Sequence, residues 1–343
     1  MRPFSYIRPT TISEAIGLLN AQPNGSDAPD EREAEQPRLL AGGTDLLTLM
    51  KGGIAAPSQL IDIKRLPELD NVIAPSPQGT RIGALTTLAQ LEDDPVIRDT
   101  HPALAEAAGL AASPQLRNMA TIGGNLLQRP RCWYFRNDMV SCWLKGGDDC
   151  PARDGENQHH AIFGDSPCVA VHPSDLATAL VALGADVRIQ GANGERTLPL
   201  EEFFIPPTDD RRRENVLEQT DVITAITVPN RPASAQSTYL KAMDRKVWAF
   251  AQVGVGAMLV IKEQRITEAR LVLGGVALAP WRATGAEEIL TGAAPERELF
   301  ERAAQVALEG GISLSHNGYK VPLAKALITR ALMAASTPRN LGA

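Results

Sequence analysis

The sequence lacks any apolar run long enough to cross a membrane, which excludes an integral helical membrane protein. The N-terminal stretch has no signal-peptide core and carries prolines where such a peptide is helical, so we expect no export signal. The 34 basic and 40 acidic residues form no basic stripe, which argues against a nucleic-acid partner. We expect a cytoplasmic protein, or a periplasmic one if another chain carries the signal.

The chain also lacks internal repeats, low-complexity tracts and any acid–base or nucleophilic residue set that would make it a complete enzyme alone. We therefore predict no catalytic residue. A length of 343 residues is sufficient for two domains, each with its own core.

Cysteine is scarce, and its distribution is uneven. All four cysteines fall within residues 132–168, in a segment rich in Gly, Asp, Pro and Asn. With few large apolar groups, this segment has to be fixed by something other than a core of its own. Our hypothesis is a thiolate metal centre formed by Cys132, Cys142, Cys150 and Cys168.

The spacing of these cysteines does not identify the metal. The intervals are nine, seven and seventeen residues, and none is the C-x-x-C pair typical of zinc ribbons. An iron–sulfur cluster, zinc, disulfides and unliganded thiols all stay open, although disulfides are unusual in a large chain without an export signal.

Charged residues surround the first cysteine. Arg129, Arg131 and Arg136 are candidates to offset the negative charge of a thiolate-bound cluster. His159 and His160 are interpreted as ordinary loop residues, because adjacent histidines on an extended backbone seldom point the same way.

A first glycine signal lies at residues 37–47, with the sequence PRLLAGGTDLL. It predicts a short strand, a sharp turn at Gly42 and Gly43, and a helix capped by Thr44 or Asp45 that ends near residues 52–53. Such a junction exposes backbone amides to an approaching phosphate. The alternative is an ordinary strand–turn–helix with no ligand.

A second glycine signal lies at residues 120–126, with the sequence ATIGGNL. Thr121 and Asn125 flank a backbone that a ligand can approach closely. Two such signals predict one ligand that is held from two sides. Further on, Ser174 is predicted to cap a helix that extends to residue 184.

The remaining pattern predicts an α+β chain. Capping boxes begin helices at Thr11 and Thr87, a helix covers residues 103–112, and residues 24–36 are a polar loop. Strands are predicted at residues 59–63, 80–84, 185–190 and 221–228. After a linker at residues 231–234 come strands at 237–241, 249–260 and 268–273, then helices at 295–308 and 321–333.

In order, the motifs at residues 39–47, 121–126 and 174–176 resemble the FAD-binding subunit of the molybdenum hydroxylases, the xanthine dehydrogenase and carbon monoxide dehydrogenase family. The resemblance implies a two-subdomain FAD-binding fold of the PCMH type at residues 1–233. It implies a C-terminal domain of the CO dehydrogenase flavoprotein type at residues 234–343, with a three-stranded sheet and helices.

The resemblance also implies the residues that bind FAD. Residues of the first motif hold the pyrophosphate through backbone amides, and those of the second approach from the other side. An acidic residue hydrogen-bonds the cofactor, and two further positions lie near the flavin. These residues are Leu39, Leu40, Ala41, Gly42, Gly43, Thr44, Asp45, Leu46; Ala111, Thr121, Gly124, Asn125; Asp175; and Ile223 and Lys241.

Residues 127–172 form an insertion between the second motif and Asp175. It resembles the insertions of the 4-hydroxybenzoyl-CoA reductase flavin subunit and, more closely, of the aldehyde oxidoreductase of bacterial periplasm. In both, four inserted cysteines bind a [4Fe-4S] cluster. The resemblance therefore implies such a cluster on Cys132, Cys142, Cys150 and Cys168.

The implied role is electron transfer within a heterotrimer. A large subunit with a molybdenum cofactor oxidises an aldehyde, a small [2Fe-2S] subunit passes the electrons on, and FAD delivers them to an external acceptor. One alternative is a related hydroxylase or a 4-hydroxybenzoyl-CoA reductase-like complex. Another is a stand-alone flavoprotein oxidase using Tyr239 and Lys241, and a third is a scaffold fixed by zinc or disulfides.

Overall fold

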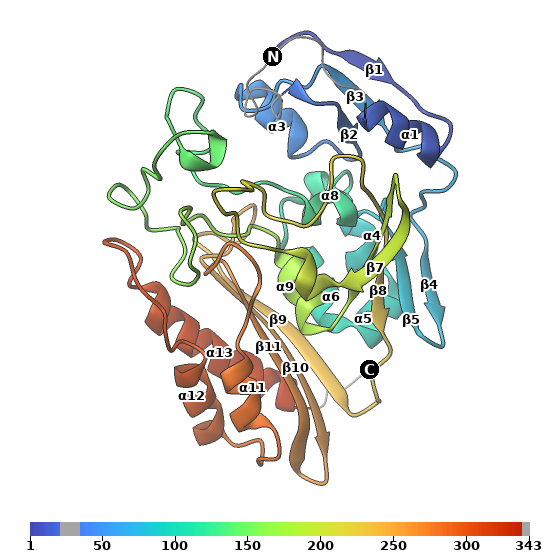
Figure 1. The fold of residues 1–343 in the computed structure, drawn as a ribbon. Coiled ribbons are helices and arrows are strands. Elements are labelled where there is room, and N and C mark those ends of the chain that lie inside the picture. The colour runs from blue at the N-terminus through green and yellow to red at the C-terminus, as the bar shows by residue number, and fades with distance from the viewer. Residues whose placement is uncertain (21–34, 338–343) are drawn as a thin grey trace.

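The computed structural model describes residues 1–20 and 35–337 and contains three separate sheets (Figure 1). The predicted loop at residues 24–36 lies largely outside these ranges. In the described part of the chain, no helix combines the length and apolar character needed to span a bilayer.

The first sheet is small and parallel, with the order β1-β3-β2. It is formed by β1 (Ser5–Ile7), β2 (Arg38–Leu40) and β3 (Gln59–Asp62), accompanied by α1 (Ile12–Leu19) and α3 (Leu46–Lys51). Thr11 caps α1 as predicted by accepting from the Glu14 amide at 3.1 Å. The Glu14 carboxylate returns to Thr10 rather than to Thr11, so the capping box is offset by one residue.

The second sheet is antiparallel, with the order β4-β5-β8-β6-β7. Its strands are β4 (Ile73–Ser76), β5 (Gly79–Gly83), β6 (Asp186–Gly191), β7 (Gly194–Pro199) and β8 (Val222–Pro229). Its helices are α4 (Leu88–Asp93), α5 (Pro95–Thr100), α6 (Pro102–Leu110), α7 (Pro114–Arg117), α8 (Ile122–Leu126), α9 (Asp175–Ala182) and α10 (Leu200–Phe203). The capping box of Thr87 with Gln90 is present at the start of α4.

The third sheet is antiparallel, with the order β12-β11-β10-β9. The three predicted strands are β9 (Ala235–Ala242), β10 (Val253–Lys262) and β11 (Arg265–Gly274), and the two predicted helices are α12 (Arg297–Val306) and α13 (Lys320–Ser336). The structure adds β12 (Trp281–Arg282) and α11 (Thr284–Leu290), which are too short to give a clear periodic signal.

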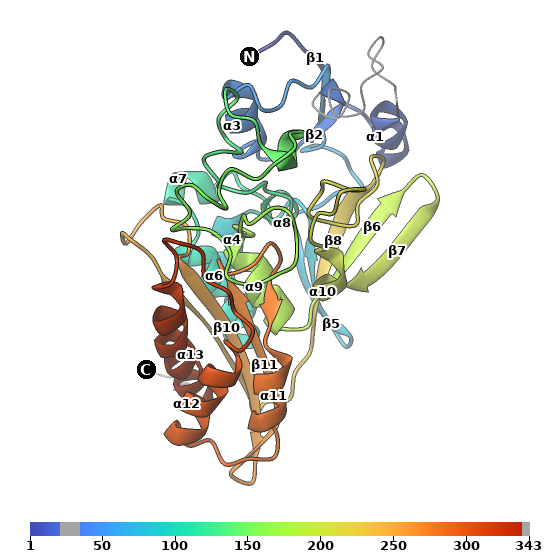
Figure 2. The same cartoon turned by 60° about the vertical axis from the view of Figure 1, so that its left-hand side comes forward.

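Helices cover both faces of the third sheet (Figure 2). Helices α11–α13 pack on one face and enclose an apolar core, whereas α6 and α9 of the preceding domain pack on the other. Added Cβ atoms at Gly256 and Gly274 would lie 3.0 and 2.5 Å from Thr178 of α9, so both strands need glycine there. The two domains therefore share a tightly packed interface.

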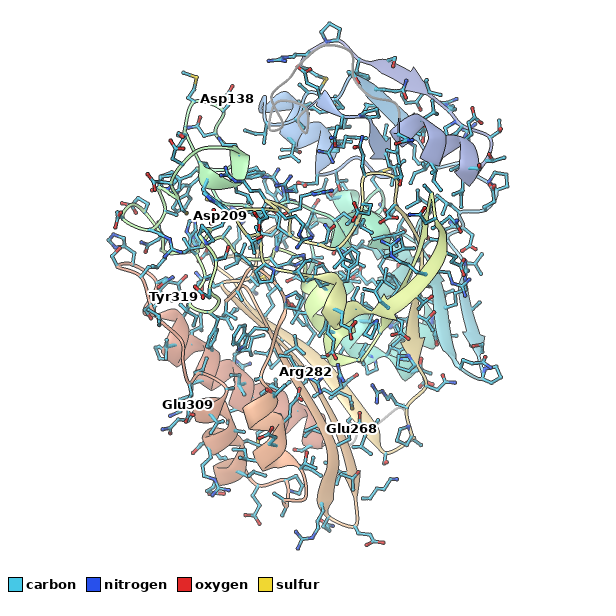
Figure 3. The ribbon with its side chains drawn as sticks, viewed as in Figure 1. Asp138, Asp209, Glu268, Arg282, Glu309 and Tyr319 are labelled. Carbon is cyan, nitrogen blue, oxygen red and sulfur yellow. The ribbon has the colours of Figure 1, made fainter. Side chains whose placement is uncertain are left out.

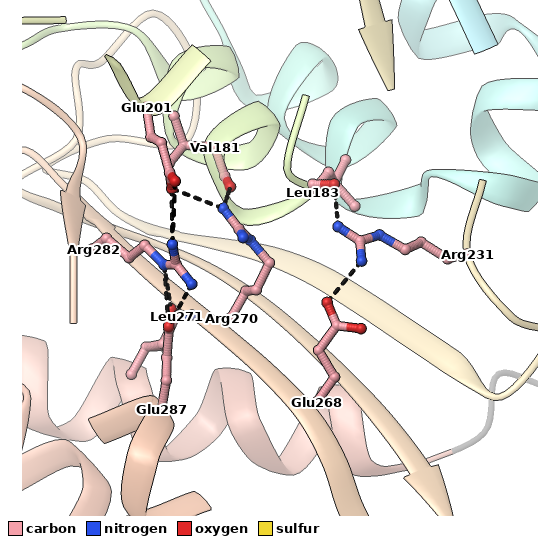
Figure 4. Close-up of polar contacts among 9 residues, drawn as sticks. All are labelled: Val181, Leu183, Glu201, Arg231, Glu268, Arg270, Leu271, Arg282 and Glu287. Atoms are coloured by element: carbon pink, nitrogen blue, oxygen red, sulfur yellow. Dashed lines mark hydrogen bonds and ion pairs between the residues drawn. The ribbon is translucent and has the colours of Figure 1, made fainter. Parts of the chain in front are cut away.

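Arginines reinforce this interface (Figure 4). Arg270 Nη2 of β11 donates to the Val181 carbonyl at 2.9 Å and to Glu201 at 3.0 Å. Arg282 also pairs with Glu201 at 3.0 Å, and Arg231 of the linker donates to the Leu183 carbonyl at 2.9 Å. Two of these contacts end on the last turn of α9, the helix that begins at Asp175.

The insertion at residues 127–172 contains no strand and only one short helical turn, at Trp143–Lys145. Protein contacts fix it from several sides. The Ile162 and Phe163 amides donate to the Val276 carbonyl at 2.9 and 3.0 Å, and the Tyr319 hydroxyl donates to the Gln158 carbonyl at 2.9 Å. Figure 3 shows Tyr319, Asp138 and Asp209 around this region. The second domain thus holds much of the insertion in place.

Candidate functional site

The first glycine loop, residues 41–45, connects β2 to α3. Gly43 has a φ of +71°, a conformation that favours glycine. A Cβ at Gly42 would lie 1.9 Å from the Met119 carbonyl oxygen, so the loop passes directly against the backbone that leads into the second glycine loop. The two glycine signals, 80 residues apart in the sequence, are therefore in contact.

The second glycine loop, residues 121–125, starts α8. Thr121 caps this helix by accepting from the Gly124 amide at 3.2 Å. A Cβ at Gly124 would meet only that hydroxyl within 4 Å, so its other side is open. The Ser174 hydroxyl donates to Asn125 Oδ1 and also accepts from the Ala177 amide at 3.0 Å, which joins this loop to the start of α9.

Both loops line a cavity of about 770 Å³, a volume in the range of cofactor sites. Residues 212–215 and the insertion close it from other sides. Most predicted FAD residues line this larger cavity: Leu39, Ala41, Gly42, Gly43, Thr44, Asp45, Leu46, Thr121, Gly124, Asn125 and Ile223. Leu40, Ala111 and Lys241 do not line it.

A smaller cavity of about 250 Å³ lies on the other side of the Asn125–Ser174 contact. Ser174, Asp175 and Tyr239 line it on one side, and Cys132 and His160 of the insertion line it on another. Arg131 lines both cavities, and its guanidinium lies 4.8 Å from the centre of the Phe250 ring. Of the predicted FAD residues, Asp175 alone lines this smaller cavity, and Leu40, Ala111 and Lys241 line neither cavity.

Asp175 carries a buried polar network. Its Oδ2 accepts from Lys241 Nζ at 2.8 Å and its Oδ1 from the Tyr239 hydroxyl at 2.6 Å. Burial raises the pKa of Asp175, an effect that Lys241 and Tyr239 oppose, and burial together with Asp175 raises the pKa of Tyr239 well above its usual value. Lys241 also donates to the Leu110 carbonyl at 3.0 Å, next to Ala111. Both side chains are committed to positioning Asp175.

Asp45 is committed to the insertion. It accepts from the Arg129 amide at 3.0 Å, from Arg136 Nη2 at 2.9 Å and from Arg131. Burial raises the pKa of Asp45, but the two guanidiniums outweigh it and hold the pKa below the usual value. Sequence reasoning assigned these arginines to the charge of a cluster, whereas the structure directs them to Asp45 and, for Arg129, to Glu214 at 3.1 Å.

The four cysteines come together in one small apolar cluster. Leu49 of α3 belongs to this cluster, so the helix after the first glycine loop rests on the cysteine region. Its other members are Phe135, Trp143, Leu144, Ala170 and Leu278, with Ile54 and Ala55 at the edge. No disulfide joins these cysteines. Cys142 and Cys168 are buried members of this cluster, and the half-buried Cys132 and Cys150 pack against it as free thiols.

The thiols affect one another electrostatically. Burial raises the pKa of Cys132 to about 11, with the nearby sulfurs adding to the shift. A hydrogen bond with Cys168 lowers the pKa of Cys150 to about 6, and the same contact raises that of Cys168. Within residues 1–20 and 35–337, no three His, Cys, Asp or Glu side chains are arranged to hold a single metal ion.

His160 is the residue that sequence reasoning passed over. Its Nε2 lies 3.2 Å from Cys132 Sγ, although 28 residues separate them. Burial lowers the pKa of His160 to about 4, so the ring is neutral at pH 7. The neighbouring His159 is exposed and packs edge-on against Trp133. The sequence carried no signal that distinguishes the two histidines.

Known proteins resemble this chain over nearly its whole length. Residues 2–231 match the family described as FAD binding domain in molybdopterin dehydrogenase, and residues 238–335 match the CO dehydrogenase flavoprotein C-terminal domain. The aldehyde oxidoreductase FAD-binding subunit PaoB of Escherichia coli (strain K12) is 37% identical over 294 residues, covering 85% of this chain and 87% of that protein.

Two further matches come from one bacterium. The carbon monoxide dehydrogenase medium chain of Hydrogenophaga pseudoflava is 31% identical over 340 residues, covering 97% of this chain and 96% of that protein. A solved structure of carbon monoxide dehydrogenase from that organism, which lacks the Mo-pyranopterin moiety, matches with a TM-score of 0.74 at 29% identity and covers 98% of each chain. The resemblance and the fold inferred from sequence are confirmed: the chain belongs to the FAD-binding subunit family of the molybdopterin dehydrogenases.

Proposed function

We propose that this chain is the FAD- and [4Fe-4S]-binding electron-transfer subunit of a molybdenum-containing aldehyde oxidoreductase. One observation carries the proposal: the insertion that gathers four cysteines also forms a wall of the cavity between the two glycine loops. When bound, FAD and the cluster supply one-electron and two-electron redox chemistry, and the protein supplies binding and orientation. We propose that the FAD-binding domain comprises residues 1–233 and the C-terminal domain residues 234–343.

In the proposed FAD site, the glycine loops hold the pyrophosphate. Gly124 leaves one side of its backbone open to close approach, and Arg131 and Arg213 line the same cavity and favour an anion. The full set proposed to bind FAD is Leu39, Leu40, Ala41, Gly42, Gly43, Thr44, Asp45, Leu46, Ala111, Thr121, Gly124, Asn125, Asp175, Ile223 and Lys241. Of these, Asp45 and Lys241 act through the residues that they position.

The cluster is proposed on Cys132, Cys142, Cys150 and Cys168. Zinc needs four ligands around one ion at about 2.3 Å for sulfur. A [4Fe-4S] cluster binds each thiolate to a different iron and so needs wider spacing. The four free thiols around one apolar cluster of the insertion support the proposal of a centre with four thiolate ligands.

The partners and the substrate are proposed from the relatives. Several are named as a medium chain or an FAD-binding subunit, and one of them as part of an aldehyde oxidoreductase. We therefore propose a large molybdenum-cofactor subunit, a small [2Fe-2S] subunit and an external electron acceptor as partners. Other relatives are named as subunits of a nicotinate dehydrogenase and a carbon monoxide dehydrogenase, so a related hydroxylase is the second candidate function.

A stand-alone oxidase is disfavoured by a specific contact. Tyr239 and Lys241 were the side chains available for catalysis over a flavin, and both are bound to Asp175 in a buried network. A lone chain that oxidises an aldehyde would restore this alternative.

The test is the visible spectrum of the purified chain combined with iron, sulfide, zinc and flavin assays. Flavin bands with about four irons and four sulfides per chain support the proposal. A colourless protein containing zinc contradicts it. Co-purification with a molybdenum subunit and aldehyde-dependent bleaching of the flavin then distinguish an aldehyde oxidoreductase from the related hydroxylase.

A further inference from the structure

His160 contacts one of the proposed cluster ligands from outside the ligand set. Its Nε2 lies 3.2 Å from Cys132 Sγ, within hydrogen-bonding distance for sulfur. Its other ring nitrogen, Nδ1, is buried and has no hydrogen-bond partner in the described part of the chain. The two nitrogens of one ring are therefore in different environments.

The direction of the hydrogen bond follows from the sulfur. A neutral imidazole carries one N–H, and the other nitrogen accepts. The Lys320 Nζ donates to the His160 carbonyl at 2.9 Å and fixes the backbone from which the ring projects. A cysteine thiolate that ligates a metal centre carries no proton and can only accept, so in the 3.2 Å contact with Cys132 Sγ the Nε2–H is the donor.

The ring is held in place before any ligand binds. Asn317 Nδ2 also donates to the His160 carbonyl, at 3.2 Å, which fixes the backbone from the second domain. The Trp133 ring packs edge-on against the imidazole with centroids 5.9 Å apart, and the Tyr134 ring lies 6.4 Å away. A donor held in this way loses little entropy on forming its hydrogen bond.

We propose that His160 tunes the reduction potential of the cysteine-bound cluster by donating its Nε2–H to the Cys132 thiolate. This inference rests on the cluster of the proposed function. Reduction adds one electron and no proton, so the cluster becomes more negative. A hydrogen bond to a ligating sulfur stabilises the more negative state and raises the potential.

The contact between His160 and Cys132 lies close to residues of the proposed FAD site. Cys132 and His160 line the same smaller cavity as Asp175 and Tyr239. Cys132 therefore lines a cavity that is also lined by Asp175, one of the residues proposed to bind FAD. A higher potential there makes the cluster a better acceptor for electrons that leave the reduced flavin.

The experiment is a redox titration of the purified protein, monitored by electron paramagnetic resonance. His160→Phe keeps a planar ring and removes the donor, and His159→Phe is the matched control at the exposed neighbour. We expect His160→Phe to lower the equilibrium constant for cluster reduction about tenfold, which is 59 mV for one electron. His159→Phe should leave the potential unchanged, and both variants should retain FAD.

If His160→Phe loses its cluster, a second pair of variants tests the same hydrogen bond. His160→Gln retains an N–H donor and His160→Met does not, so Gln should keep the potential closer to that of the wild type. An unchanged potential in a donor-free variant with full iron content would overturn the inference, as would an equal shift in His159→Phe. A wild-type protein without iron would instead overturn the proposed cluster.

Discussion

Asp45 of the first glycine loop and Arg136 of the cysteine insertion form an ion pair, with Oδ1 and Nη2 2.9 Å apart. Ninety-one residues separate them in the sequence. Arg131 joins the same carboxylate, and Leu49 of the following helix packs in the cysteine cluster. The insertion and the proposed phosphate loop are thus one structural unit.

We expect Asp45→Asn to reduce the FAD and iron content together. The substitution leaves two largely buried arginines without their carboxylate, which costs about 3 kcal/mol of unfolding free energy. Flavin and iron assays with a denaturant titration measure this. Asp154→Asn, at an exposed position of the same insertion, is the control and should behave like the wild type. Loss of one cofactor alone in Asp45→Asn would contradict the shared unit.

We expect Gly42→Ala to abolish FAD binding. The new Cβ would lie 1.9 Å from the Met119 carbonyl oxygen, so the two glycine loops have to move apart. Such overpacking costs about 1–3 kcal/mol of unfolding free energy. Gly17→Ala in α1 is the control, because nothing lies within 4 Å of its added Cβ. Full flavin content in Gly42→Ala would reject the assignment of this loop.

We expect Arg270→Ala to weaken the contact between the domains. The side chain bonds the Val181 carbonyl and Glu201, and loss of these charged hydrogen bonds costs about 2 kcal/mol of unfolding free energy (Figure 4). Arg297→Ala is the control, since that arginine makes an exposed helix pair with Glu301 and should change stability by under about 0.5 kcal/mol. Equal effects in a denaturant titration would argue against this role of Arg270.

The sequence predicted what depends on local chemistry. Gly42 and Gly43 lie in the turn predicted between β2 and α3, where Gly43 has a positive φ, and Thr87 forms the expected capping box. The resemblance then placed these motifs in one family. Short elements such as β12 were missed because two residues carry no periodic signal.

Long-range polar contacts could not be predicted. His160 meets Cys132 because Lys320 and Asn317, from the far end of the chain, hold its backbone. Lys241 and Asp175 were both predicted to lie near FAD, but only the structure shows that they form a buried ion pair. Nothing in the residue types around these positions specifies which partner each side chain finds.

Stability should fall in acid because His101 is buried. Its Nε2 pairs with the Thr80 hydroxyl at 3.0 Å, and burial, assisted by Arg231, lowers its pKa to about 4. The unfolded chain, with an ordinary pKa near 6.5, binds a proton at a higher pH than the folded chain does. The unfolding free energy therefore declines as the pH falls from 6.5 towards 4, by about 2–3 kcal/mol from this residue at pH 4.5. Denaturant titrations at pH 7 and pH 4.5 measure the decline. His101→Gln should reduce it by that amount, whereas His316→Gln, at an exposed position, should not. An identical decline in the wild type and His101→Gln would show that the pKa of His101 is the same in the folded and unfolded states.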